Sequence, residues 1–213
     1  MNEPNCFGAV RWHPGGMRPE LPPHLDPHLA HWLDLLDRWN RTHALTALPV
    51  AARREELLLD AAALLPFLEA VPHGGRIADL GTGMGTPAVV LALARPDLEV
   101  LAVDASAKKL AFVRQAALEL PVPNLTPVHG RLEGLPSLQA HWGTAKALGS
   151  LMDLAGWWAR HGRPGAPFYA LKAAEGLSEP CPAGWQRLEH TYALPTRGVR
   201  TIVELRPPGE FPS

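Results

Sequence analysis

The sequence predicts an α/β protein with a mostly parallel sheet, and three observations lead to that fold class. Short apolar runs alternate with segments of helical periodicity between residues 77 and 205. A glycine-rich loop at residues 81–85 follows the first apolar run, and Asp104 ends the second. Strands that alternate with helices form parallel sheets covered on both faces, and ligands bind beyond the carboxyl ends of such strands.

The N-terminal part is expected to contribute helices rather than strands. Proline and glycine are frequent in residues 1–27, so this segment should be irregular. Apolar residues then recur at helical spacing from Leu29 to Trp39, and a second helix is expected over residues 51–68. We therefore divide the chain into three parts: an irregular segment (1–27), N-terminal helices packed on the core (28–72) and a sheet domain (73–207).

The elements of the sheet domain are predicted from its apolar runs. After the glycine loop we expect, in chain order, helix 87–94, strand 99–104, helix 107–120, strand 125–129, a strand within 138–147, a helix, strand 168–171 and a closing antiparallel pair at 185–192 and 202–205. The helix before strand 168–171 contains Leu154, Trp157 and Trp158, and we expect both tryptophans in the core.

Composition argues against several classes of protein. The formal net charge of -1 excludes a basic field over the whole surface, so any nucleic-acid contact must come from a local patch. Cys6 and Cys181 lack a Cys-x-x-Cys partner, and no window approaches the ~20 apolar residues of a membrane span. We expect a cytoplasmic monomer with no metal site and no membrane partner.

The order of residues in the glycine loop narrows the choice of ligand. A dinucleotide site needs Gly-x-Gly-x-x-Gly, whereas Gly85 comes one residue too early for that pattern. Asp79 would repel a pyrophosphate but suits the amino group of a methionine-type ligand, and Asp104 can accept both hydroxyls of a ribose. The loop is similar to that of S-adenosylmethionine-dependent methyltransferases. An ordinary tight turn and a nicotinamide dehydrogenase are the alternatives.

Further segments match one family in their order and spacing along the chain. They are Trp39-Asn40-Arg41-Thr42, Leu45-Thr46-Ala47-Leu48, Leu59-Asp60, residues 79–87, Val103-Asp104-Ala105-Ser106, Gly130-Arg131-Leu132-Glu133, Lys146-Ala147 and Tyr169-Ala170-Leu171-Lys172. Together they resemble the 16S ribosomal RNA guanine-N7 methyltransferases called RsmG or GidB. The resemblance implies a Rossmann-like class I methyltransferase sheet with an N-terminal helical extension. It also implies S-adenosyl-L-methionine as cofactor, and 16S rRNA or the small-subunit particle as partner.

The same resemblance implies roles for particular residues. Lys146 stands where the family carries an arginine near the cofactor and the target base, and it is the catalytic candidate, in a positioning role. The cofactor-binding candidates are Asp79, Gly81, Gly83, Gly85, Thr86, Asp104, Leu132, Glu133 and Lys146. The RNA-binding candidates are Arg41, Arg53, Arg131, Lys172, Arg197 and Arg200.

The chain departs from the family pattern mostly on the substrate side. Ala44 replaces an asparagine, Leu57 a histidine, and Thr201 the histidine of an Arg-His pair. Thr86 replaces a bulky apolar residue, and Lys146 replaces the arginine. Two alternatives therefore stay open. One is a paralogue that methylates another RNA or a small molecule, and the other is an inactive protein that binds the cofactor or the ribosome.

Overall fold

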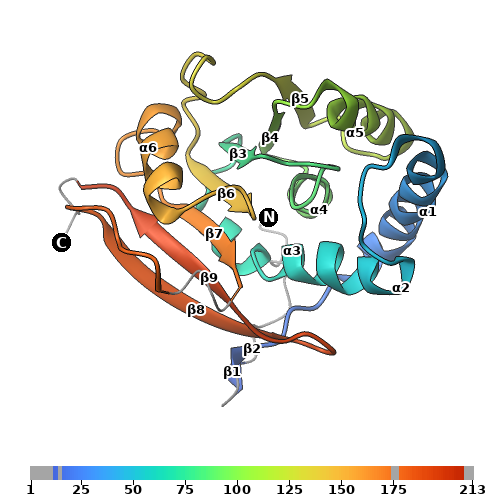
Figure 1. Ribbon diagram of the computed structural model, residues 1–213, viewed down its shortest axis with the longest axis horizontal. Coiled ribbons are helices and arrows are strands. Elements are labelled where there is room, and N and C mark those ends of the chain that lie inside the picture. Colours follow the sequence, from blue (N-terminus) through green and yellow to red (C-terminus); the bar gives the residue numbers. More distant parts are fainter. Residues whose placement is uncertain (1–11, 14–15, 174–177, 209–213) are drawn as a thin grey trace, which may run out of the picture.

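The computed structural model describes residues 12–13, 16–173 and 178–208, and their strands form one sheet (Figure 1). The strands are β1 (Trp12–His13), β2 (Gly16–Met17), β3 (Arg76–Leu80), β4 (Glu99–Asp104), β5 (Leu125–His129), β6 (Trp142–Lys146), β7 (Phe168–Lys172), β8 (Gln186–Leu194) and β9 (Gly198–Arg206). Their order in the sheet is β1-β2-β8-β9-β7-β6-β3-β4-β5.

The predicted fold class is confirmed by the pairing of these strands. Strands β3 to β7 run parallel to one another, and β9 pairs antiparallel with both β7 and β8. The expected irregularity of residues 1–27 does not hold at two places, because β1 and β2 pair with each other while β2 adds to β8, and because helical residues begin at Pro23. Met17 is buried opposite Tyr192, which accounts for the order there. Residues 1–11 of that segment lie outside the described part.

Helices are found at the predicted places, except that residues 51–68 do not form one helix. They are α1 (Asp26–His43), α2 (Val50–Arg53), the π-helical segment η2 (Arg54–Leu59), α3 (Asp60–Ala62), α4 (Ala88–Ala94), α5 (Ala107–Glu119) and α6 (Leu151–His161), with 3-10 turns η1 (Pro23–Leu25) and η3 (Leu65–Ala70).

The single helix expected over residues 51–68 is instead a succession of short helical segments. Within η2, the Asp60 N–H reaches the carbonyl of Glu55, five residues back, which is the π-helical pattern. Further on, Pro66 has no N–H to continue the α-helical ladder, and the chain tightens into the 3-10 turn η3. This succession brings a different set of side chains to the sheet edge than a regular helix would.

The two faces of the sheet bury separate cores. Ile77 and Val100 pack with residues of α1, α4 and α5, whereas Ala78 and Leu80 face the opposite way and pack with α6. Side chains of a strand alternate between its two faces, so a five-residue strand such as β3 contributes to both cores. Figure 1 shows α1 and α5 together on one side of the molecule and α6 at the other end.

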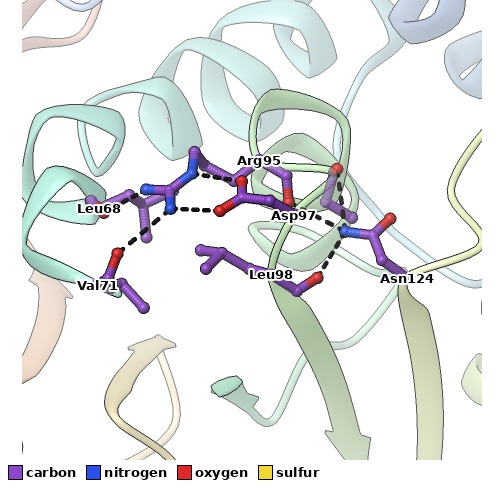
Figure 2. Close-up of polar contacts among 7 residues, drawn as sticks. Leu68, Val71, Arg95, Asp97, Leu98 and Asn124 are labelled. Atoms are coloured by element: carbon purple, nitrogen blue, oxygen red, sulfur yellow. Dashed lines mark hydrogen bonds and ion pairs between the residues drawn. The ribbon is translucent and has the colours of Figure 1, made fainter. Parts of the chain in front are cut away.

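A polar cluster fixes the amino ends of β3, β4 and β5, away from the glycine loop (Figure 2). The Arg95 guanidinium forms a bidentate pair with Asp97, at 2.7 Å for both contacts, and donates to the carbonyls of Leu68 and Val71. This pairing lowers the pKa of the Asp97 carboxyl. Asn124 donates to the carbonyl of Leu98 at 2.9 Å. With this end of the sheet tied together, the loops at the opposite, carboxyl ends are held in register.

Candidate active site

A cavity of about 500 Å³ opens at the carboxyl edge of the sheet. The loops that follow β3, β4, β5 and β6 form most of its lining, and Leu57 of η2 and Trp157 of α6 complete it. The predicted site residues on this lining are Gly81, Gly83, Thr86, Asp104, Leu132, Glu133 and Lys146. Arg131, Lys109 and Leu148 line it as well. The fold therefore gathers at one cavity residues that are far apart in the sequence.

The glycine loop is shaped by backbone geometry that other residues rarely adopt. Gly81 has φ +70°, and a Cβ atom there would lie 2.4 Å from Cδ1 of Leu148. Gly83 has φ +58°, but nothing lies within 4 Å of its Cβ position. Both glycines face the cavity, and the loop presents backbone to a ligand where a side chain would intrude.

Gly85 and Asp79 lie beside the cavity rather than on its lining. A Cβ atom at Gly85 would lie 3.1 Å from Val89 and 3.3 Å from Val113, so this glycine faces the apolar core beside α4 and α5. Asp79 is 1% exposed, and its Oδ2 accepts hydrogen bonds from the Thr82 hydroxyl at 2.6 Å and the Ala88 N–H at 3.1 Å. These contacts also tie the loop to the first turn of α4.

The Asp79 carboxyl is buried in a place that disfavours its ionised form. Burial raises its pKa to about 7, although the hydrogen bonds from Thr82 and Ala88 act in the opposite direction. Its Oδ1 atom has no hydrogen-bond partner within the described residues. A buried carboxylate oxygen without a partner fits a cationic group on a ligand, because such a group would both neutralise and hydrogen-bond it.

Asp104 is fixed by two backbone N–H groups. Its Oδ2 accepts from Gly83 at 2.9 Å, and its Oδ1 accepts from Ser106 at 2.7 Å. The first contact joins the glycine loop of β3 to the end of β4. The carboxylate lines the cavity and keeps capacity for further donors, such as a pair of hydroxyl groups.

The loop after β5 contributes Leu132 and Glu133. Leu132 is buried, whereas Glu133 is exposed and accepts a hydrogen bond from Nε1 of Trp157 at 2.9 Å. The N–H of Glu133 itself and then the Trp157 indole lower the pKa of this carboxyl. We expected Trp157 in the core, but it is half-buried and lines the cavity. The sequence did carry a signal for this exposure, because Trp157 stands one position away from Trp158, which belongs to the buried residues of α6.

Lys146 ends β6 and reaches across to the N-terminal helices. Its Nζ lies 2.5 Å from Oδ2 of Asp60 and also donates to the carbonyl of Glu56. The Tyr192 hydroxyl donates to Oδ1 of Asp60 at 2.5 Å. Burial, together with the Asp60 charge, raises the pKa of Tyr192, so the phenol stays protonated and donates. Asp60 is not among the site residues predicted from the sequence, because the sequence around a buried acid does not show which distant cation it will pair with.

The predicted RNA-binding residues fall into two groups. In the first group, Arg53 contacts Asp37, Lys172 contacts Glu179, and Arg197 contacts Glu56. Arg200 lies 3.8 Å from the same Glu56. The side chains of Arg53 and Lys172 are only 7% and 10% exposed, so both serve to hold the fold together.

The second group consists of Arg41 and Arg131, which are exposed. Neither lies within 4.0 Å of a carboxylate in the part of the chain that the structure describes. Arg131 and Lys109 line the cavity. Lys108, the residue before Lys109, donates to the carbonyl of His43 at 2.8 Å and so joins the end of α1 to the start of α5.

The described residues include neither a metal-binding cluster nor a membrane-spanning helix. No cluster of three or more histidine, cysteine or acidic side chains could hold a metal ion there. In the same part of the chain, no helix is long and apolar enough to cross a membrane.

Residues 26–182 match the family model GidB, described as rRNA small subunit methyltransferase G. The Ribosomal RNA small subunit methyltransferase G of Neisseria gonorrhoeae is 37% identical over 73% of this chain and 74% of its own length. The protein of the same name from Bordetella avium is 36% identical over 84% and 83%.

Solved structures share the fold. TrmN from Thermus thermophilus superposes with a TM-score of 0.55 and 24% identity, over 76% of this chain and 55% of its own. A SAM-dependent O-methyltransferase from Thermotoga maritima has a TM-score of 0.57 and 14% identity, over 85% and 73%.

Proposed function

Since the chain belongs to the rRNA small subunit methyltransferase G family, we propose that it transfers a methyl group from S-adenosyl-L-methionine to N7 of a guanine in 16S ribosomal RNA. We place this activity in the cytoplasm and assign it to a monomer. The observation that carries the proposal is the cavity at the sheet edge. Its lining combines the glycine loop, Asp104, Glu133 and Lys146.

The residues of the cavity fit this cofactor in charge and in shape. S-adenosyl-L-methionine, when bound, supplies an electrophilic methyl group on a positively charged sulfur. Asp79, buried beside the cavity, would offer its unpartnered carboxylate oxygen to an ammonium group, and Asp104, on the lining, would offer a fixed carboxylate to ribose hydroxyls. The open backbone at Gly83 leaves room for the methionine portion, and the buried Leu132 supplies an apolar contact for a purine.

Methyl transfer to guanine N7 requires little acid–base catalysis from the protein. The N7 atom has a free lone pair, so no general base has to remove a proton. The chain's residues contribute by orienting the two reactants, which can lower a barrier by about 7 to 11 kcal/mol. Lys146 can donate to the guanine O6 beside N7 from the position that Asp60 gives it.

RNA would approach over the basic residues at the mouth of the cavity. Arg131 and Lys109 lie on its lining, and Lys108 and Arg41 belong to the adjoining ends of α5 and α1. Such residues would contact phosphates and fix the register of the RNA without reading its sequence. With a net charge of -1 over the chain, binding should depend on this local set and weaken with added salt.

Mass spectrometry of 16S RNA fragments from cells with and without this chain tests the proposal. We expect one 7-methylguanosine to disappear when the chain is absent and to return with the wild-type copy. An unchanged map would contradict the proposed substrate and favour a paralogue with another target or an inactive binder. Titration with S-adenosylhomocysteine separates those two possibilities from a protein that binds no cofactor.

Replacement of Lys146 tests its part in the reaction. Lys146→Ala should lower kcat by about 10-fold or more, because one charge-assisted hydrogen bond to the base is lost. Lys146→Arg should keep or raise the rate, since the guanidinium fork can donate to O6 and to Asp60 at once while the N7 lone pair stays free to accept the methyl group. Methyl transfer to 16S RNA under single-turnover conditions measures both. Complete loss in Lys146→Arg would mean that the ammonium has a role of its own.

A further inference from the structure

Trp157 differs from its neighbour Trp158 in a way that points to a ligand. Trp158 is 1% exposed, and its Nε1 donates to the carbonyl of Ala166 inside the core. Trp157 is half-buried, lines the cavity, and donates to the exposed carboxylate of Glu133. The first indole is therefore part of the core, whereas the second presents part of its surface to the cavity.

The Trp157 ring is held from two sides. At one edge Nε1 binds Glu133 in the loop after β5 at 2.9 Å. Gly149, in the loop after β6, lies beyond Cζ3 without touching it through a side chain, and only an added Cβ atom there would come within 3.5 Å. The ring also packs against the core cluster on the α6 face of the sheet. An aromatic ring fixed in this way can receive a flat ligand with little loss of side-chain entropy.

The anchor at Glu133 places the polar edge of the indole near the end of the cavity that would hold the adenosine. Strand β5 pairs directly with β4, and Asp104 lies opposite His129 in that pairing. Lys146, the proposed contact to the target base, ends β6, three strand spacings or roughly 14 Å away in the sheet order β6-β3-β4-β5, and the indole extends from the β5 loop toward Gly149 on that side. The cofactor's purine is thus the flat group nearest to the Glu133 edge.

We propose that Trp157 is a cofactor-binding residue whose indole stacks on the purine of S-adenosylmethionine, with Glu133 fixing the ring in place. The inference rests on the proposed function for its ligand. It adds a residue from α6 to a site otherwise built from loops after the strands. It also gives Glu133 a second role, since the carboxylate orients the indole through the Nε1–H bond.

Calorimetric titration with S-adenosylhomocysteine tests this assignment on the full chain. We expect Trp157→Ala to raise Kd by about 10-fold or more, the size that loss of one base–aromatic stack predicts, and Trp157→Phe to raise it less. Trp185→Phe is the matched control, because Trp185 packs against the same core cluster but does not line the cavity. An unchanged Kd in a folded Trp157→Ala protein would overturn the proposal. So would lost methyl transfer to RNA with unchanged Kd, which would place Trp157 against the RNA.

Tryptophan fluorescence provides a second measurement if Trp157→Ala fails to fold. Stacking on a purine should quench the indole, so the ligand-induced quenching of the wild type should shrink in Trp157→Phe and persist in Trp185→Phe. Quenching of equal size in Trp157→Phe would overturn the proposal. If the wild type bound no S-adenosylhomocysteine at all, the proposed function would fail first, and this inference with it.

Discussion

The two sides of the cavity are built by different means. The cofactor wall, residues 79–86 with Asp104, is held by hydrogen bonds over short sequence separations, such as the Thr82 hydroxyl to Asp79, three positions apart, and the Gly83 N–H to Asp104, 21 positions apart. The helical wall, residues 54–60, is held by side chains from distant segments. Tyr192 meets Asp60 across 132 positions of sequence, and Thr196 meets Glu55 across 141. The cofactor wall is thus encoded locally, and the helical wall exists only when the whole chain has folded.

The helical wall is also where the β8–β9 hairpin meets the N-terminal helices (Figure 1). Glu55 accepts from the N–H and hydroxyl of Thr196 and from the N–H of Arg197. The Thr196 hydroxyl is the largest of the contacts that lower the pKa of Glu55. Two of the predicted RNA-binding residues, Arg197 and Arg200, are thereby engaged with Glu56 of the same wall.

Removal of Asp60 should break the helical wall. Asp60→Ala takes away the carboxylate that both Lys146 and Tyr192 contact, in a place where Asp60 is 6% exposed. We expect a loss of about 3 kcal/mol in the free energy of unfolding, measured by urea denaturation. Asp26→Ala, which breaks the exposed pair with Arg54, is the control and should cost less than about 1 kcal/mol. Equal losses in both variants would contradict the account of this wall.

A paired substitution in the glycine loop should separate backbone strain from steric conflict in the cofactor wall. Gly83→Ala adds only the strain of a positive φ, about 1 to 2 kcal/mol. Gly81→Ala adds the same strain and a methyl group 2.4 Å from Leu148, so it should cost about 1 to 3 kcal/mol more. Thermal unfolding and the Kd for S-adenosylhomocysteine measure both variants. A larger loss in Gly83→Ala would mean that the loop is packed differently.

The pH dependence of cofactor binding should report on Asp79. Its folded pKa of about 7 lies above the ordinary 3.8, so the ligand-free folded state holds an extra proton between those values. This group's contribution to stability therefore falls as the pH rises from about 4 to about 7. A ligand ammonium favours the ionised carboxylate, so affinity should rise about 10-fold from pH 6 to pH 8, with release of a proton.

Titration calorimetry with S-adenosylhomocysteine in buffers of different ionisation enthalpy measures directly how many protons are released on binding. Asp79→Asn removes the titrating group, and its affinity should be weaker and flat across the same range. A wild-type affinity that does not change between pH 6 and pH 8 would contradict the place given to Asp79.

The contrast between the walls also explains what could be predicted from the sequence. The glycine spacing and Asp104 are local signals, and the strands that carry them alternate with helices in a readable order. The same local reading does not show that Gly85 faces the apolar core, because its neighbours Val89 and Val113 are set by the packing of two helices. Glycine spacing alone cannot say which face of a turn meets a ligand.

The remaining differences come from tertiary contacts. Arg53 reads as a surface cation, yet the helix succession turns it onto Asp37 and the carbonyl of Leu48. Trp157 reads as part of the core because it is a large aromatic residue beside Trp158, but neighbouring helix positions point about 100° apart, and only Trp158 faces the core fully. For both Arg53 and Trp157, the group that the side chain contacts lies on another element. The fold, rather than the neighbouring sequence, decides which group that is.

The most direct test of the account is the affinity of the wild type and of Asp104→Ala for S-adenosylhomocysteine. Asp104 joins the glycine loop to β4 and faces the cavity, so its removal should weaken binding by about 1 to 3 kcal/mol, or about 5- to 150-fold in Kd. Binding by the wild type with that loss in the variant is the predicted result. Equal affinities in two folded proteins would contradict the assignment of this cavity as the cofactor site.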